Sequence, residues 1–297
     1  MKTTWANPIY FEYTKAANPQ MPPILANEMT SIPEISKSNI VPIDLSGNLG
    51  TKYPATSPVC LVSFINLMAS DKLKLANKAV SNLFVIIKGE GVLDTDFGKM
   101  NWGTGDIVVV PYTKVLDIYA LKDARVYWVT DEPIVNYLGV VPTLPIFDPV
   151  CYPYNQIKEV TNKYNQEENA KIRNRNGVLL SNPRCPLTKT ISPTLWALFN
   201  VIEPNTVQAP HQHNSVALDL CFSAKEGVYT LLSKTIDDKG NLVNPIKMNW
   251  KPGAAFITPP AWWHSHHNES DEDAVVIPVQ DAGLQTYLRT LFIKFSS

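Results

Sequence analysis

The sequence lacks the features that mark several large classes of protein. Its 26 basic and 27 acidic residues give a net charge of −1, so no field of one sign would attract nucleic acid or an anionic membrane. No apolar run reaches the roughly 18 residues of a membrane-spanning helix, and the first residues lack the apolar core of a secretory signal. We therefore expect a cytoplasmic protein with neither nucleic-acid nor membrane partners.

Cysteine and glycine are also scarce. The four cysteines, at positions 60, 151, 185 and 221, form no C-x-x-C pair, which excludes a zinc knuckle and a thioredoxin-type motif. Reduced thiols are the simplest interpretation. The 13 glycines stand against 24 prolines, 12 tyrosines and seven tryptophans, a balance that favours many short strands over long helices.

Short β-rich stretches predict an all-β protein. They occupy residues 58–130 and return between residues 195 and 279, at a spacing typical of a sandwich or barrel. Prolines after residue 141 mark a linker, and the polar stretch 155–169 predicts a surface helix. Near the end, a helical spacing predicts an amphipathic closing helix. It is carried by Leu284, Tyr287, Leu288, Leu291 and Phe292.

The two β-rich regions resemble each other. Residues 83–111 contain Leu-Phe-Val-Ile-Ile-Lys-Gly-Glu-Gly and then Trp-Gly-Thr-Gly-Asp-Ile-Val-Val-Val-Pro. Residues 218–259 contain Leu-Asp-Leu-Cys-Phe-Ser-Ala-Lys-Glu-Gly and then Trp-Lys-Pro-Gly-Ala-Ala-Phe-Ile-Thr-Pro. Both have a strand, a glycine turn, a Trp-x-x-Gly motif and a strand that ends in proline. We interpret this as a two-copy repeat, and therefore as two barrels of one type.

All five histidines fall in the second repeat. Residues i and i+2 of a strand share a face, so His211 pairs with His213 and His264 with His266, while His267 faces the other way. Two such strands inside a barrel supply three or four nitrogen ligands, a set that suits Fe, Mn, Zn, Ni or Cu. Structural histidines beside aromatic residues are the alternative. Two H-x-H pairs in strand context favour a metal site.

The histidine segments resemble the two signatures of cupins in the gentisate 1,2-dioxygenase group. The first is Ala-Pro-His-Gln-His-Asn-Ser-Val-Ala-Leu at residues 209–218, and the second is Gly-Ala-Ala-Phe-Ile-Thr-Pro-Pro-Ala-Trp-Trp-His-Ser-His-His-Asn at residues 253–268. The resemblance implies a bicupin, with His211, His213 and His264 as metal ligands. It makes His266 a histidine on the substrate side, able to act as acid or base.

With the repeat, this resemblance predicts an all-β fold of two tandem cupin barrels with an N-terminal arm, a short linker helix and a C-terminal helix. We expect the arm over residues 1–57 and a degenerate barrel over residues 58–140. A linker over residues 141–185 then leads to the metal-binding barrel of residues 186–297. In the first repeat, Leu75, Asn77 and Leu116 align with the three ligand histidines, so no metal can bind there.

The chain departs from the family at Asp219. Ring-cleaving relatives carry an arginine there, which grips the substrate carboxylate. Asp219 reaches the pocket only if the chain reverses near residues 214–215, as the family's does. In that case it is a second catalytic candidate beside His266, and an amine, hydroxyl or guanidinium fits the pocket better than a dianion. The alternative is a solvated or capped aspartate. The linker arginines Arg173 and Arg175 are interpreted as solvated.

Three functions remain open. The first is an Fe(II)-dependent dioxygenase or oxygenase that acts on a small organic substrate with O₂, because three histidines without a carboxylate leave coordination positions open. The second is an isomerase, lyase or hydrolase that uses Zn, Mn or Ni as a Lewis acid. The third is a bicupin that binds a small molecule without turnover. A homo-oligomer is expected in each case, with the N-terminal arm as a clasp.

Overall fold

The computed structural model describes residues 5–29, 36–76, 78–168, 173 and 175–296. Within these residues the helices are α1 (Tyr13–Ala16), α2 (Ser46–Leu49), α3 (Glu132–Leu138), α4 (Tyr154–Asn165) and α5 (Ala282–Leu288). No described helix combines the length and the apolar character of a membrane span. The remaining regular structure is β-sheet, which confirms the predicted all-β fold with a linker helix and a C-terminal helix.

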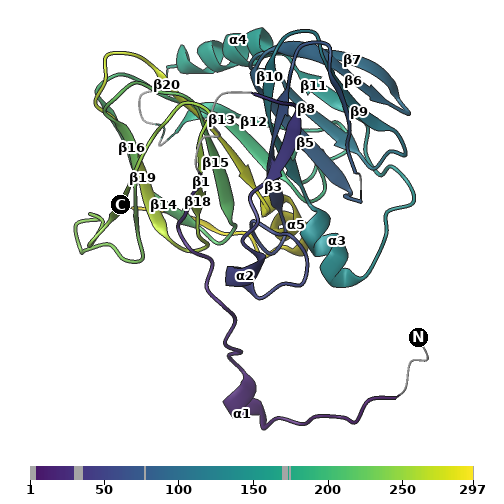
Figure 1. Cartoon of the computed structure of the whole chain (residues 1–297). Coiled ribbons are helices and arrows are strands. Elements are labelled where there is room, and N and C mark those ends of the chain that lie inside the picture. Colours follow the sequence, from purple (N-terminus) through teal and green to yellow (C-terminus); the bar gives the residue numbers. More distant parts are fainter. Residues whose placement is uncertain (1–4, 30–35, 77, 169–172, 174, 297) are drawn as a thin grey trace.

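The strands divide between two repeats (Figure 1). Those of the first barrel are β2 (Asn39–Pro42), β3 (Leu61–Leu67), β4 (Lys72–Lys74), β5 (Ser81–Lys88), β6 (Glu90–Thr95), β7 (Gly98–Gly103), β8 (Ile107–Pro111), β9 (Leu116–Ala120), β10 (Ala124–Thr130) and β11 (Val150–Tyr152). Those of the second barrel are β1 (Glu28–Met29), β12 (Asn176–Leu180), β13 (Trp196–Ile202), β14 (Thr206–His213), β15 (Ala217–Ser223), β16 (Val228–Ser233), β17 (Ile246–Asn249), β18 (Ala255–Thr258), β19 (Trp263–Asn268), β20 (Ala274–Gln280) and β21 (Ile293–Phe295).

Each barrel consists of two antiparallel sheets with matching strand order. The first has a six-stranded sheet, β11-β8-β5-β10-β3-β2, and a four-stranded sheet, β4-β9-β6-β7. The second has β1-β18-β15-β20-β13-β12 and β17-β16-β19-β14-β21. The glycines of the two Trp-x-x-Gly motifs occupy equivalent turns, at Gly105 (φ 90°) and Gly253 (φ 78°). A side chain is strained at such angles, so both turns favour glycine.

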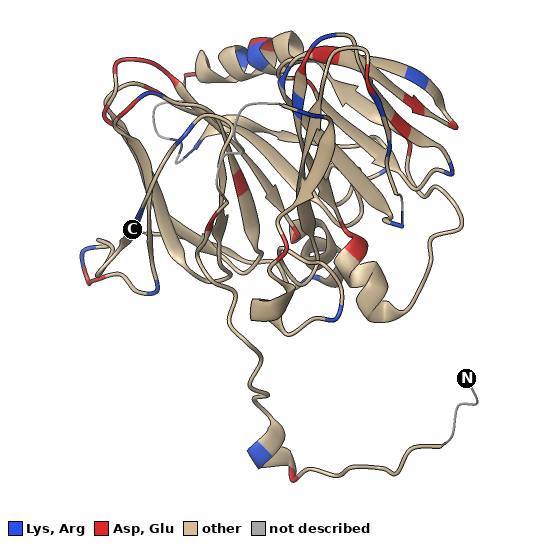
Figure 2. Cartoon of the chain, viewed as in Figure 1, with Lys and Arg blue, Asp and Glu red and all other residues tan. Residues whose placement is uncertain are grey.

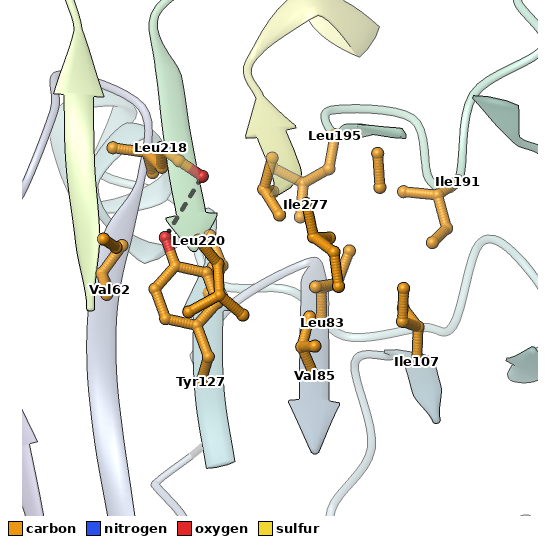
Figure 3. Close-up of a cluster of buried hydrophobic side chains, with 14 of the residues drawn as sticks. Val62, Leu83, Val85, Ile107, Tyr127, Ile191, Leu195, Leu218, Leu220 and Ile277 are labelled. Carbon is orange, nitrogen blue, oxygen red and sulfur yellow. Dashed lines mark hydrogen bonds between the residues drawn. The ribbon is translucent and has the colours of Figure 1, made fainter. Parts of the chain in front are cut away.

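The two six-stranded sheets pack against each other and share one core (Figure 3). Leu83 and Val85 of the first barrel lie in the same buried cluster as Leu218, Leu220 and Ile277 of the second. Tyr127 of β10 crosses between the sheets and donates a hydrogen bond to the carbonyl of Leu218 (3.3 Å). Apolar side chains on both faces of each sheet explain why these strands read as continuous hydrophobic runs.

The interior of the first barrel is apolar where the second barrel carries histidines. Leu75 and Leu116, which align with two of those histidines, are both buried in its core cluster. Asn77, which aligns with the third, lies outside the described residues. Among the described residues, the one group of three or more His, Cys, Asp or Glu side chains close enough to share a metal ion lies in the second barrel.

The segments expected to form the arm and the linker contribute strands to both barrels. From the arm, β1 pairs with β18 of the second barrel, and β2 pairs with β3 of the first. From the linker, β11 joins the first barrel and β12 joins the second. The expected surface helix is α4, which ends at Asn165.

The C-terminal helix is shorter than its apolar spacing predicts. It ends at Leu288, and Arg289 follows in a left-handed conformation (φ 61°). The prediction that Leu291 and Phe292 continue the helix was wrong. The Asn214 side chain accepts a hydrogen bond from the Phe292 amide and donates one to the Thr290 carbonyl, both at 2.9 Å. These bonds direct the chain into β21, which pairs with β14.

Candidate metal centre

Two neighbouring strands bring the histidines together. β14 carries His211 and His213, and β19 carries His264 and His266. The strands are antiparallel, with His211 opposite His264 and an irregular register between Gln208 and His211. Because cross-strand partners share a face, both histidine pairs lie on one side of the sheet. That side also carries Leu232 of β16, a member of the buried cluster of the second barrel.

Three of the five histidines converge. One ligand atom from each of His211, His213 and His264 lies within 4.8 Å of the others. The ring centroid of His264 is 4.0 Å from that of His211 and 4.9 Å from that of His213. His213 and His264 are buried, and His211 is partly exposed at the side of β21. Three imidazole nitrogens at this spacing suit a transition-metal ion.

The hydrogen bonds of His213 show which of its nitrogens is available to a metal. Its Nδ1 lies 3.0 Å from both the carbonyl oxygen and the Oγ of Ser215. The Ser215 hydroxyl donates its hydrogen to Gln280 Oε1 (2.8 Å), so it accepts from His213. Both contacts therefore place the proton on Nδ1 and leave the Nε2 lone pair free to coordinate a metal.

His264 is held in the same tautomer. Its Nδ1 lies 3.1 Å from the carbonyl oxygen of Trp262, which can only accept, so Nε2 is again the available nitrogen. Burial lowers the pKa of His264, and the neighbouring histidines lower it further. Burial also lowers the pKa of His213, to about 4. Both imidazoles are therefore neutral at pH 7, the form that binds metal. The donor set fits a metal ion.

His211 differs because its Nδ1 contacts the Nη2 atom of Arg175. Arg175 precedes β12, and its Nη1 donates to the carbonyl of Ala209 (3.2 Å). A guanidinium only donates, so this contact requires a lone pair on His211 Nδ1. If a neutral His211 binds a metal through Nε2, as its two partners can, Nδ1 carries the proton and Arg175 has to move away. If His211 binds through Nδ1, Arg175 stands where the ion would be.

His266 lies deeper along β19 and is fixed by a second polar pair. Its ring centroid is 5.9 Å from that of His264, and its Nδ1 is 2.8 Å from Thr230 Oγ1. Trp250 Nε1 donates to the same hydroxyl (2.9 Å). His267 points to the opposite face, where it stacks on the ring of Tyr229 with centroids 4.7 Å apart.

Asp219 faces the interior of the second barrel. The chain crosses from one sheet to the other between β14 and β15, which is the reversal that an inward Asp219 requires. Its cross-strand partner Phe256 belongs to the buried cluster of that barrel. Thr258 Oγ1 donates a hydrogen bond to Asp219 Oδ2 (2.6 Å), and burial raises the pKa of Asp219 to about 7. Asp219 is therefore a buried carboxyl with a hydroxyl partner, and not a solvated one.

Sequence reasoning missed Arg175, which it interpreted as solvated. Arg173 does lie near the surface, beside Glu167. The two arginines are two residues apart, and nothing in their sequence context separates them. Ser215, Gln280 and Thr230 were missed as well. Ser215 follows the H-x-H motif by two residues, and this closeness is the one local signal that could have pointed to it.

The Ser215 contact leads to a prediction about metal affinity. We expect Ser215→Ala to weaken metal binding about tenfold, because one of the two acceptors that orient His213 is lost and the carbonyl remains. Ser265→Ala is the matched control, since Ser265 contacts His267 on the other face. Titration calorimetry with Zn²⁺ or Fe²⁺ measures both. Equal losses in the two variants would contradict the role of Ser215.

The comparisons with known proteins agree on the fold. No family model matches the chain, and no curated protein matches its sequence. Among solved structures, salicylate 1,2-dioxygenase from Pseudoaminobacter salicylatoxidans, determined with gentisate, superposes with a TM-score of 0.72 at 12% identity. The match covers 96% of this chain and 88% of that one. A point mutant of the same enzyme, also with gentisate, gives a TM-score of 0.72 at 12% identity over 97% of this chain and 91% of the mutant.

An oxalate decarboxylase from Bacillus subtilis, a deletion mutant, gives a TM-score of 0.56 at 14% identity. That match covers 94% of this chain and 85% of the decarboxylase. Together with the paired sheets and the repeated Trp-x-x-Gly turns, these likenesses make the chain a bicupin by fold. At such identities they establish the architecture alone, and the chemistry has to be argued from the site.

Proposed function

We propose that this bicupin is a non-heme Fe(II) dioxygenase or oxygenase that acts on a small organic substrate. The observation that carries the proposal is the convergence of His211, His213 and His264 within 4.8 Å, with Nε2 of two of them directed away from their hydrogen-bond acceptors. Among the described residues no carboxylate joins this group. A ferrous ion held by three histidines keeps open positions for O₂ and substrate.

His266 and Asp219 are proposed to handle protons beside this site. Thr230 holds His266 Nδ1 and thereby leaves Nε2 as the nitrogen that can exchange a proton with a substrate. Burial gives Asp219 a pKa of about 7, so this carboxyl can either hold or release a proton near neutral pH. Thr258 orients the carboxyl through its hydrogen bond to Oδ2.

Arg175 supports a substrate that bears an acidic group. Asp219 replaces the arginine of the related ring-cleaving enzymes, yet the cation of Arg175 lies against His211 from another part of the chain. Coordination of a metal by Nε2 of His211 frees Arg175 from Nδ1, and its planar donors then suit a carboxylate of the substrate. We therefore propose a small carboxylic acid as the substrate, in place of the amine that Asp219 alone favours.

The test of this function is metal analysis combined with O₂ uptake. The protein is purified without affinity metals, loaded anaerobically with Fe²⁺, and mixed with hydroxylated aromatic acids, aliphatic acids and amines in an oxygen electrode. Consumption of O₂ with an organic acid supports the proposal. A protein that binds Zn²⁺, Mn²⁺ or Ni²⁺ and converts a substrate without O₂ would replace the proposal with a Lewis-acid enzyme, because three neutral histidines also suit zinc.

Arg175→Gln tests the substrate class separately. We expect kcat/KM for an acidic substrate to fall about 10- to 100-fold, mostly through KM, because a charge-assisted hydrogen bond is lost. Metal affinity should hold or rise, since the contact with His211 Nδ1 is removed. Arg184→Gln is the control, because Arg184 lies exposed beside Asp148. A fall in metal affinity without a change in KM would contradict this role for Arg175.

A further inference from the structure

Residues 5–23 form an arm that projects away from both barrels (Figure 1). Every residue of the arm is exposed. Within the described part of the chain, its hydrogen bonds join arm residues to one another, as where Glu12 accepts from the amides of Thr14 and Lys15. The body begins near Pro22, which lies beside Gly50 of the α2 turn. Contacts with the chain's own barrels therefore do not explain the arm.

The composition of the arm is unlike that of a solvated tail. Glu12 and Lys15 are its two charged residues, and they cancel. Its large apolar side chains are each at least 75% exposed, and they are Trp5, Ile9, Tyr10, Phe11, Tyr13 and Met21. Tails that stay in water are rich in charge and poor in aromatic residues. Apolar side chains at this density favour burial against a partner.

The body carries a second uncovered apolar surface, which we call the α3 strip and define as residues 137–146. Its exposed side chains are Tyr137, Leu138, Val140, Val141, Leu144 and Ile146. The α3 strip contains no charged residue, and it follows α3 as an uncharged stretch of chain (Figure 2). α3 lies at the same end of the molecule as the point where the arm leaves the body (Figure 1).

We infer that the arm docks on the α3 strip of a second copy of this chain. Because both surfaces lie at one end of the molecule, a two-fold axis at that end lets each copy's arm reach the other copy's strip, as a closed dimer requires. Residues 5–13 span about 30 Å when extended, comparable to the ten residues of the strip. Neither surface carries a net charge, so docking removes little ionic hydration.

The test is the oligomeric state of the full chain and of a chain that lacks residues 1–21. Sedimentation equilibrium should show a dimer for the full chain, and removal of the arm should weaken dimerisation at least 100-fold, by about 3 kcal/mol. Phe11→Ser in the arm and Val141→Asp in the strip should each shift the equilibrium toward monomer. Leu187→Ser is the matched control, because Leu187 is 96% exposed outside both surfaces.

Mixing separates the proposed contact from general stickiness. The armless chain keeps its strip, and the Val141→Asp chain keeps its arm, so neither should dimerise alone, whereas a mixture should form a one-armed heterodimer. In that mixture the emission of Trp5 should move to shorter wavelength, a change that Trp5→Phe removes. A monomeric full chain, an armless dimer, or a monomer whose arm binds lipid vesicles would each overturn the inference. All of these results are independent of the proposed enzymatic function.

Discussion

A chain with His264→Ala will bind no metal at concentrations that saturate the unmodified protein. His264 is the central ligand candidate, with its ring 4.0 Å from that of His211 and 4.9 Å from that of His213. Its loss leaves two nitrogens and a buried gap between them. We expect affinity to fall roughly a thousandfold or more, which is about 4 kcal/mol. Elemental analysis and calorimetric titration measure this loss directly.

The matched variant is His267→Ala. It removes a histidine three positions along the same strand, but from the face that stacks on Tyr229. It should keep one metal ion per chain. Metal at about 1,000 times Kd stabilises a protein by about 4 kcal/mol, so the metal-dependent rise in Tm should survive in this variant and vanish in His264→Ala. Metal content that is equal in the two variants would refute the site.

Replacing Asp219 by Asn should stabilise the protein at pH 8 by about 2–4 kcal/mol. Burial raises the pKa of Asp219 to about 7, roughly three units above that of a solvated aspartate, and each unit corresponds to about 1.4 kcal/mol. The stability that the protonated carboxyl contributes is complete below about pH 4, the unfolded pKa, and is lost as the pH rises through 7. An amide carries no charge to bury, and its oxygen can still accept from Thr258.

The measurement is urea unfolding of both proteins between pH 4 and pH 8. The difference in unfolding free energy should grow with pH and level off above 7. Taking the difference removes the buried histidines, whose lowered pKa values act in the opposite direction, and Asp281, whose pKa burial also raises to about 7. Asp237→Asn is an exposed control without this rise. A difference that is independent of pH would show that Asp219 is not charged in the folded barrel.

The fold could be predicted from the sequence because its signals are local and occur twice. Each repeat places a Trp-x-x-Gly turn before a strand that ends in proline, and the structure puts Gly105 and Gly253 at equivalent positive φ angles. The histidine pairs were visible for the same reason, because alternation along one strand fixes the face of each side chain. The closing helix was predicted too long because Asn214, more than 70 residues earlier, redirects the chain at Phe292.

The surroundings of the histidines depend on contacts that local patterns do not encode. Arg175 meets His211 across 36 positions, and Gln280 meets Ser215 across 65. Such pairs follow from how the sheets close and leave no periodicity to detect. Asp219 is intermediate: strand alternation set its face relative to Leu218 and Leu220, but only the crossing between the sheets showed which barrel that face lines.

The core shared by the two six-stranded sheets makes the barrels mutually dependent in folding. Each sheet buries one apolar face against the other, with Leu83 and Val85 on one side and Leu220 and Ile277 on the other. A fragment that contains the histidine barrel alone would expose that entire face and aggregate. The two copies should therefore unfold in a single cooperative transition. The copy without histidines keeps its place by serving as half of its neighbour's hydrophobic interior, which frees its own interior from any chemical duty.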